Sequence, residues 1–197
     1  MRASEVKIEQ TWRSLGMRGT GSNDVVIDNL FIPDAAIAFS RKSAEWHPVF
    51  QIIATIAFPL IYAVYVGVAE RARDIAVELA GRKSTTSYSL DLAGRMETSL
   101  RAAQLAHRWM LDTVALNAPS AETVNEVMIG RSLTAEHAIR AVELALELAG
   151  GAAFYRRNGL ERCFRDIQGA RFHPLQSGPQ AQYAGATALG QPVINIF

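Results

Sequence analysis

The chain is poor in cysteine: Cys163 is the only one among its 197 residues. A single cysteine excludes an internal disulfide and a cysteine-based zinc cluster. It also favours the cytoplasm, since small secreted domains depend on disulfides. The first seven residues contain no apolar core of the kind that a signal peptide requires. We therefore expect a cytoplasmic protein.

The chain also lacks an excess of charge of either sign. It has 20 basic and 19 acidic residues and no long basic run, so no nucleic-acid partner is expected. The four histidines, His47, His107, His137 and His173, do not show the spacing of a helical zinc site, and no metal is expected. A Gly-x-Ser-x-Gly elbow is missing, so a hydrolase of that type is unsupported.

Charge is absent altogether between Val49 and Ala69, a stretch long enough to span a bilayer. A transmembrane helix is therefore one interpretation of this segment. Gln51, Thr55 and Pro59 weigh against it, and the other helical segments are apolar enough to cover a soluble helix on every side. A buried central helix of a bundle is favoured, with no membrane partner.

About half of the residues, 49%, are hydrophobic, which is enough to fill the core of one domain or somewhat more. Residues 4–39 have a β and turn pattern. Gly16, Gly19 and Gly21 break any helix there, and residues 24–33 are rich in β-branched side chains and end at proline. So short a β-region cannot bury its own face, so it must pack on the helices or on further chain.

From residue 43 onward the pattern is helical. Long helices are predicted over about 44–82, with a kink or break at Pro59, over about 89–117, and from an N-cap at Ser120 to Gly150 and Gly151. A shorter helix is predicted over 160–172 and a last apolar piece over 181–189. Apolar residues recur every three or four positions, and in the third helix Arg131 interrupts the stripe. The economical architecture is an antiparallel bundle.

The segment from Gly150 to Asp166 is unusual. Its double glycine permits close approach by a planar ligand or another helix, and several arginines then follow beside Glu161 and Asp166. Taken by themselves, these charges indicate a solvated helix with ion pairs four residues apart, such as Glu161 with Arg165.

The same segment resembles the C-terminal signature of acyl-CoA dehydrogenases, in which a Gly-Gly pair is followed by an aromatic residue, Glu-Arg and Arg-Asp. Residues 15–22 and 30–33 resemble the end of that family's middle β-domain, and residues 47–83 resemble the first helix of its C-terminal bundle. The resemblance implies a mainly α fold, an antiparallel four-helix bundle (43–197) preceded by a short β segment (1–42), the remnant of an incomplete β-barrel domain. It also implies that family members carry an N-terminal helical domain and most of a β-barrel in addition.

Two branches of the family differ in their chemistry. In many of the dehydrogenases the catalytic glutamate lies eight residues beyond the aspartate of the Arg-Asp pair; here that position is Pro174, beside His173, and Glu147 replaces the usual glutamine before the glycines. The pattern around Leu160–Pro174 more closely resembles the oxygenase components of two-component flavin monooxygenases, such as dibenzothiophene monooxygenase and p-hydroxyphenylacetate hydroxylase.

The resemblance therefore implies a monooxygenase that uses reduced flavin and oxygen on an aromatic or heterocyclic small molecule, with FMN or FAD as cofactor and a separate flavin reductase as partner. It also implies a homodimer or homotetramer. Two alternatives stay open. One is an FAD-dependent acyl-CoA dehydrogenase, and the other is a non-catalytic helical oligomerisation module.

Several residues receive roles from the resemblance. His173 is the expected catalytic group, since imidazole accepts or donates a proton near neutral pH; a histidine that bonds helix-end carbonyls is the alternative. Arg82 is expected at a flavin phosphate, in this family often that of a neighbouring subunit, although it could merely complement a helix C-terminus. Gly150 and Gly151 are expected to lie against the cofactor. Arg165 and Asp166 are expected to form a structural pair that holds the last helix, and His47 is expected to be structural.

Overall fold

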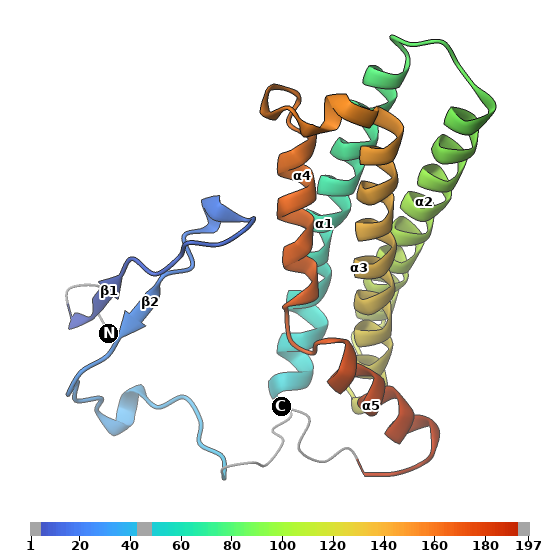
Figure 1. The fold of residues 1–197 in the computed structure, drawn as a ribbon. Helices are drawn as coiled ribbons and strands as arrows, with labels where there is room; N and C mark the ends of the chain where they lie inside the picture. Colours follow the sequence, from blue (N-terminus) through green and yellow to red (C-terminus); the bar gives the residue numbers. More distant parts are fainter. Residues whose placement is uncertain (1–4, 43–48, 193–197) are drawn as a thin grey trace.

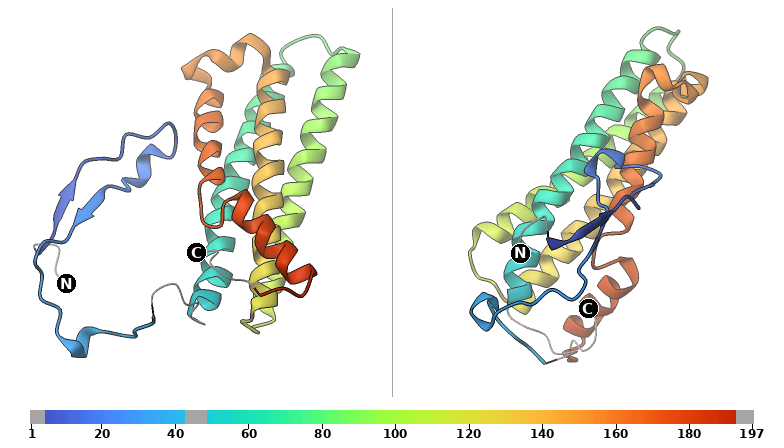
Figure 2. Two further views of the ribbon diagram at one scale, coloured as in Figure 1. Left: turned by 60° about the horizontal axis from the view of Figure 1, so that its bottom comes forward. Right: turned by 90° about the vertical axis from the view of Figure 1, so that its left-hand side faces the viewer.

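A computed structural model describes residues 5–42 and 49–192, and within these ranges the chain is mainly helical. Four helices lie side by side in alternating directions, and a fifth crosses one end of them (Figures 1 and 2). The predicted antiparallel four-helix bundle is confirmed. The helices are α1 (Val49–Ala80), α2 (Ser87–Ala115), α3 (Ala121–Ala149), α4 (Leu160–Ile167) and α5 (Ser177–Ala188).

Side-chain caps fix the starts of α2 and α3. Thr86 Oγ1 accepts a hydrogen bond from the Ser89 amide at 3.1 Å, and Ser120 Oγ accepts one from the Thr123 amide at 3.2 Å. In both cases the N3 hydroxyl reaches back to the amide of the capping residue, so two otherwise unpaired donors are satisfied. The predicted N-cap at Ser120 is confirmed.

Pro59 does not break α1, although it lies inside the helix. Proline removes one helical hydrogen bond, but here the residue is buried and its carbonyl oxygen lies 2.8 Å from His107 Nε2 on α2. The contact with His107 joins α1 to α2 beside the proline, and the helix continues through this position. The predicted start of this helix near residue 44 lies outside the described residues.

The remaining helix boundaries differ modestly from the predictions. α4 ends at Ile167 and continues as a 3₁₀ turn over Gln168–Arg171, so the predicted helix 160–172 changes its type near its end. α5 begins at Ser177, earlier than predicted. Short 3₁₀ turns, Gly150–Phe154 and Arg156–Asn158, connect α3 to α4. Gly150 ends α3 with a φ of 63°, a conformation that glycine adopts without strain.

The core lies between α1, α2 and α3 and also receives the inner side of α4. Many of its residues are alanines, which let the helices approach closely, and larger side chains fill the remaining space. The large side chains include Met96, Met110, Met128, Leu144 and Leu160, all essentially inaccessible to solvent.

Met96 offers a test of this core. Replacing it with alanine should lower the free energy of unfolding by about 2–5 kcal/mol, because the neighbouring helices cannot fully close the cavity. Leu90→Ala on the same helix is the matched control. Leu90 is 64% exposed, so its loss should change stability by no more than about 0.5 kcal/mol. Chemical denaturation followed by circular dichroism measures both, and equal effects of the two substitutions would contradict this packing.

Within the described residues, α1 is the one helix long and apolar enough to cross a membrane, with a mean hydropathy of 2.2 in its most apolar window. One side of the helix, including Tyr62, Tyr65 and Ala69, is buried in the bundle. The opposite side exposes Ile53 and Leu60. Because the core helix of a soluble bundle passes the same test, and 44% of this window is buried against the other helices, the packing favours the bundle interpretation.

The N-terminal segment forms a small two-stranded antiparallel sheet, β1 (Lys7–Glu9) and β2 (Asp24–Val26), with Lys7 opposite Val26. The strand predicted over residues 24–33 is much shorter in the structure. No third strand pairs with it within the described residues, and the apolar side chains beyond it, such as Phe31, are exposed. The stretch between the two strands lies beside α4, while the strands themselves and the chain after them lie farther from the helices (Figure 2).

Candidate functional site

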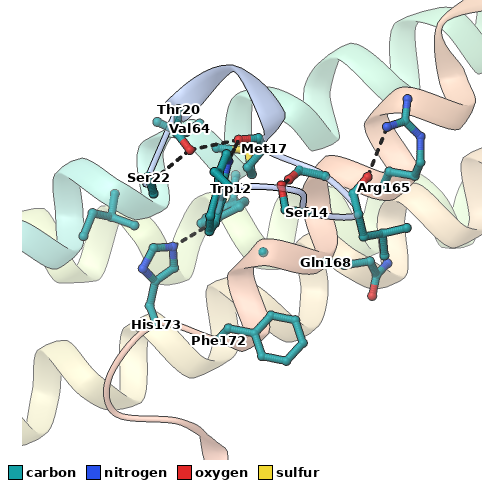
Figure 3. A pocket seen from close by; sticks show the side chains of 15 residues that line it. Trp12, Ser14, Met17, Thr20, Ser22, Val64, Arg165, Gln168, Phe172 and His173 are labelled. Carbon is teal, nitrogen blue, oxygen red and sulfur yellow. Dashed lines mark hydrogen bonds between the residues drawn. The ribbon is translucent and has the colours of Figure 1, made fainter. Parts of the chain in front are cut away.

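A pocket of about 470 Å³ lies between the N-terminal segment, the middle of α1 and the C-terminal end of α4 (Figure 3). Its volume falls within the range of small-molecule sites. The walls are mainly apolar and are formed by Trp12, Leu15, Met17, Ile61, Val64 and Phe172. Polar groups are few and include the hydroxyls of Thr20, Ser22 and Tyr65 and the imidazole of His173.

Three contacts attach the N-terminal wall of the pocket to α4. The Met17 amide donates a hydrogen bond to Asp166 Oδ1 at 2.6 Å, and Arg165 Nη1 donates to the Leu15 carbonyl at 3.1 Å. Gly16 lies so close to the Arg165 main chain that a Cβ on residue 16 would be 2.0 Å from the Arg165 carbonyl oxygen. These contacts place residues 15–17 and α4 side by side, although they are about 150 residues apart in the sequence.

The roles of Arg165 and Asp166 therefore differ from the expectation. The Glu161–Arg165 ion pair is present, with Arg165 Nε 2.7 Å from Glu161 Oε2. Arg165 and Asp166, however, do not hold the last helix as a pair, because each binds the main chain of the N-terminal segment. Both residues hold residues 15–17 against α4, and Arg165 also lines the pocket.

His173 follows the 3₁₀ turn at the end of α4 and is half-buried in the pocket. Its Nε2 lies 2.7 Å from the hydroxyl of Tyr65, and its ring meets the edge of the Tyr62 ring at a centroid distance of 6.0 Å. Burial lowers the pKa of His173 below its usual value of 6.5, and the positive charge of Arg131 lowers this pKa further. The neutral form of the imidazole therefore predominates at pH 7, and in this form one ring nitrogen accepts and the other donates.

The segment that carries His173 rests on a buried arginine. Arg131, only 2% exposed, donates from Nη2 to the carbonyl oxygens of Ala170 at 3.3 Å and His173 at 2.8 Å. Its guanidinium lies 5.2 Å from the centre of the Tyr62 ring, and the Tyr62 hydroxyl donates to the Ala170 carbonyl at 2.7 Å. Burial raises the pKa of Tyr62 far above its usual value, so this hydroxyl stays protonated and remains a donor.

Arg82, Gly150 and Gly151 lie together at the other end of the bundle. The neighbouring Lys83 Nζ donates to the Ala149 carbonyl at 2.9 Å, which joins the end of α1 to the end of α3. Arg82 is exposed and bonds Glu78 Oε1 at 2.5 Å. The helix between Tyr65 and Ala80 alone spans about 22 Å at 1.5 Å per residue. The structure thus separates these three residues from His173 within one chain. His47 lies outside the described residues.

The other residues in the pocket wall and beneath it were only weakly marked in the sequence. Arg131 was visible as an interruption of an apolar stripe, but its position beneath His173 depends on how α3 packs. Tyr62 and Tyr65 lie in the charge-free stretch and resemble ordinary core residues in their spacing. Nothing in the sequence placed Trp12 near α1. Among the described residues, no three histidine, cysteine or carboxylate groups lie close enough together to hold a metal ion.

The structure is thus a helical bundle with a mainly apolar pocket and a half-buried histidine in its wall. Residues 60–177, more than half of the chain, match the family described as acyl-CoA dehydrogenase, C-terminal domain. The chain belongs to this family.

Three curated relatives are similar over nearly the whole chain. The indole-3-acetate monooxygenase of Acinetobacter baumannii is 27% identical, over 96% of this chain and 53% of the relative. An amino sugar nitrososynthase of Streptomyces rubradiris is 29% identical, over 94% of this chain and 47% of the relative. The oxygenase subunit of a flavin-dependent monooxygenase of Rhodococcus jostii is 24% identical, over 98% and 57%. The chain therefore spans about half the length of these relatives.

Solved structures confirm the fold. The structure of KijD3 in complex with FMN and a dTDP-linked amino sugar superimposes with a TM-score of 0.88, at 24% identity, over 95% of this chain and 49% of that one. At this level of identity the likeness concerns the arrangement of the elements. It includes the N-terminal segment as well as the helices.

Proposed function

We propose that this chain is the C-terminal part of a cytoplasmic flavin-dependent monooxygenase that oxidises an aromatic or heterocyclic small molecule. The observation that carries the proposal is the position of His173, a neutral imidazole held by Tyr65 in a pocket with apolar walls. The relatives named as monooxygenases support the same chemistry.

The pocket suits the ring system of a flavin. Trp12, Met17 and Phe172 offer flat or adaptable apolar surfaces, and the hydroxyls of Thr20 and Ser22, 3.1 Å apart, provide polar contacts at one side. The one guanidinium in the lining, that of Arg165, is already bonded to Glu161 and Leu15. The pocket as described therefore has contacts for a ring but no free cation for a phosphate.

Arg82, whose ion pair with Glu78 is exposed and can be exchanged for a phosphate, supplies a cation at the opposite end of the bundle. It lies too far away to reach a flavin whose ring lies beside His173 of the same chain. A homodimer or homotetramer removes this difficulty. In such an assembly Arg82, Gly150 and Gly151 of one subunit contact the flavin tail bound to another subunit. The exposed apolar side of α1, which includes Ile53 and Leu60, is consistent with further protein covering the bundle.

A separate reductase delivers the reduced flavin, which supplies the electrons that activate oxygen when it is bound. The residues of this chain orient the substrate and move a proton. The neutral imidazole of His173 accepts a proton from an ionisable group of the substrate, such as a phenolic hydroxyl, and Tyr65 fixes the direction of the ring. The apolar walls exclude water from the reacting groups.

In this proposal residues 1–42 belong to the middle β-domain of the complete enzyme, and residues 43–197 form the bundle domain. The three-residue strands and the exposed Phe31 are consistent with a segment that continues a larger sheet. The boundary itself falls at residues 43–48, which lie outside the described ranges.

An acyl-CoA dehydrogenase is a less favoured function for the same fold. That reaction needs a carboxylate base, and none of the described residues that line the pocket is aspartate or glutamate. A helical oligomerisation module would need no pocket at all.

Binding measurements separate the three functions. We expect the chain, titrated without oxygen with reduced FMN, reduced FAD and an acyl-CoA in turn, to bind a reduced flavin and to ignore the acyl-CoA. Trp12→Ala should weaken flavin binding about fivefold, because a stacked aromatic contributes roughly 1 kcal/mol. Trp109→Ala is the matched control, since Trp109 is equally exposed but does not line the pocket.

Tight binding of acyl-CoA together with FAD would favour the dehydrogenase instead. Failure to bind any of the three would favour the oligomerisation module. Equal effects of the two tryptophan substitutions would mean that the flavin binds elsewhere.

A further inference from the structure

The contacts around His173 point to a role for the arginine beneath it. We propose that Arg131 is a positioning residue: its guanidinium fixes the main chain that carries His173 and thereby sets the hydrogen bond between the imidazole and Tyr65. The inference rests on the proposed function, in which His173 handles the proton.

Arg131 holds the main chain of residues 170–173 in place. One guanidinium nitrogen, Nη2, bonds the carbonyl oxygens at both ends of residues 170–173. The Tyr62 hydroxyl adds a second bond to the Ala170 carbonyl, at 2.7 Å. The turn between these carbonyls therefore cannot shift without breaking several buried hydrogen bonds, and the imidazole projects from its end toward Tyr65 on α1.

Core packing does not explain an arginine at this position. Its neighbours in the stripe of α3, such as Val127, Met128 and Ala135, are apolar and buried. Among the described residues no carboxylate forms an ion pair with Arg131, and its Nε has no hydrogen-bond partner. A buried cation without a counter-charge costs free energy, and an apolar residue of similar size would fill the space at less cost. The hydrogen bonds from Arg131 to the carbonyls of Ala170 and His173 explain why an arginine stands here.

The charged and titratable groups around the imidazole come from three helices. Tyr62 and Tyr65 face it from α1, Arg131 lies beneath it on α3, and Arg165 and Asp166 lie on α4, where both bind the N-terminal segment. The pocket residues contributed by the N-terminal segment are uncharged. Arg171, two residues before His173, is exposed and bonds Gln168. Arg131 is the buried cation among these groups, and its charge helps to keep the pKa of His173 below 6.5.

The test measures the imidazole directly and needs neither flavin nor substrate. In the full chain, ¹⁵N nuclear magnetic resonance follows the titration of His173, whose signal is identified by its loss in His173→Asn. In Arg131→Met the pKa of His173 should rise toward 6.5, and the signature of its hydrogen bond with Tyr65 should weaken. Arg140→Met on the same helix, where the arginine is partly exposed and pairs with Glu143, should change neither.

A double-mutant cycle separates positioning from charge alone. In the parent chain, Tyr65→Phe should shift the His173 titration, and in the Arg131→Met background the same substitution should have little further effect. Arg131→Lys keeps the charge, but the shorter side chain does not carry a donor to the position of Nη2, so it should retain much of the lowered pKa and still weaken the effect of Tyr65→Phe. This variant also serves if Arg131→Met does not fold.

An unchanged titration in folded Arg131→Met would overturn the inference, as would an effect of Tyr65→Phe that is the same in every background. These outcomes are independent of the proposed function. If the cycle behaves as expected but the chain binds no reduced flavin, the positioning role stands and the proposed function fails. If the chain binds reduced flavin but the His173 titration does not respond to Arg131→Met, the proposed function stands and the positioning role fails.

Discussion

Gly16→Ala is expected to detach the N-terminal segment from α4 and to open the pocket. The new Cβ would lie 2.0 Å from the Arg165 carbonyl oxygen and 2.6 Å from the Asp166 amide nitrogen. Both are main-chain atoms of a packed helix, so no side-chain rotation relieves the overlap. Residues 15–17 must move away, and the bond from the Met17 amide to Asp166 breaks.

The size of the effect follows from that bond. A hydrogen bond to a charged group contributes about 2 kcal/mol, so docking of the segment should weaken by a factor of roughly 30 from this loss alone. Affinity for reduced flavin should fall at least as far, since Trp12, Leu15 and Met17 leave the wall. Fluorescence of Trp12, proteolysis within residues 15–42 and flavin titration measure the change.

Gly19→Ala is the matched control, because a Cβ at Gly19 meets nothing within 4 Å. The helical signal in circular dichroism should be similar in both variants, since the bundle core does not include residue 16. If Gly16→Ala bound flavin as tightly as Gly19→Ala, residues 15–17 would not form a wall of the flavin site.

His173→Asn in the complete enzyme should lower the rate of product formation by about 10²–10⁴-fold, the usual contribution of a general acid or base. Asparagine retains a hydrogen-bonding group but cannot take up a proton, so affinity for reduced flavin should change little. The measurement is single-turnover product formation with reduced flavin and oxygen. A variant that forms product at the parent rate would remove His173 from the chemistry.

The pH dependence gives a second readout of the same substitution. Because burial lowers the pKa of His173 in the folded chain, the neutral ring persists to a pH below 6.5, and the rate should decline only in more acidic solution. In that window the unfolded chain binds a proton that the folded chain does not. The corresponding stability is therefore complete above pH 6.5 and is lost as the pH falls toward the folded pKa. His173→Asn should remove this part of the pH dependence of unfolding.

Local patterns were sufficient for most of the fold. The spacing of apolar residues predicted the long helices within a few residues, and Ser120 marked a helix start because a hydroxyl before an amphipathic run satisfies free amides. Pro59 was misleading, because the loss of one helical hydrogen bond does not outweigh the burial of α1 on both sides of the proline. The strand predicted over 24–33 was too long, because β-branched composition does not supply the neighbouring strand that a ladder requires.

The sequence by itself determined the helical bundle, since the bundle depends on residue type and spacing along one chain, and the family resemblance in the sequence pointed to His173. Only the tertiary structure decided that Tyr65 and Arg131 hold that histidine, that Asp166 binds Met17, and that Arg82 lies at the far end of the bundle. The physical reason is that a pocket is made by groups distant in sequence. Which side chains meet there depends on the directions in which packed helices and a returning segment carry them, and periodicity does not encode those directions.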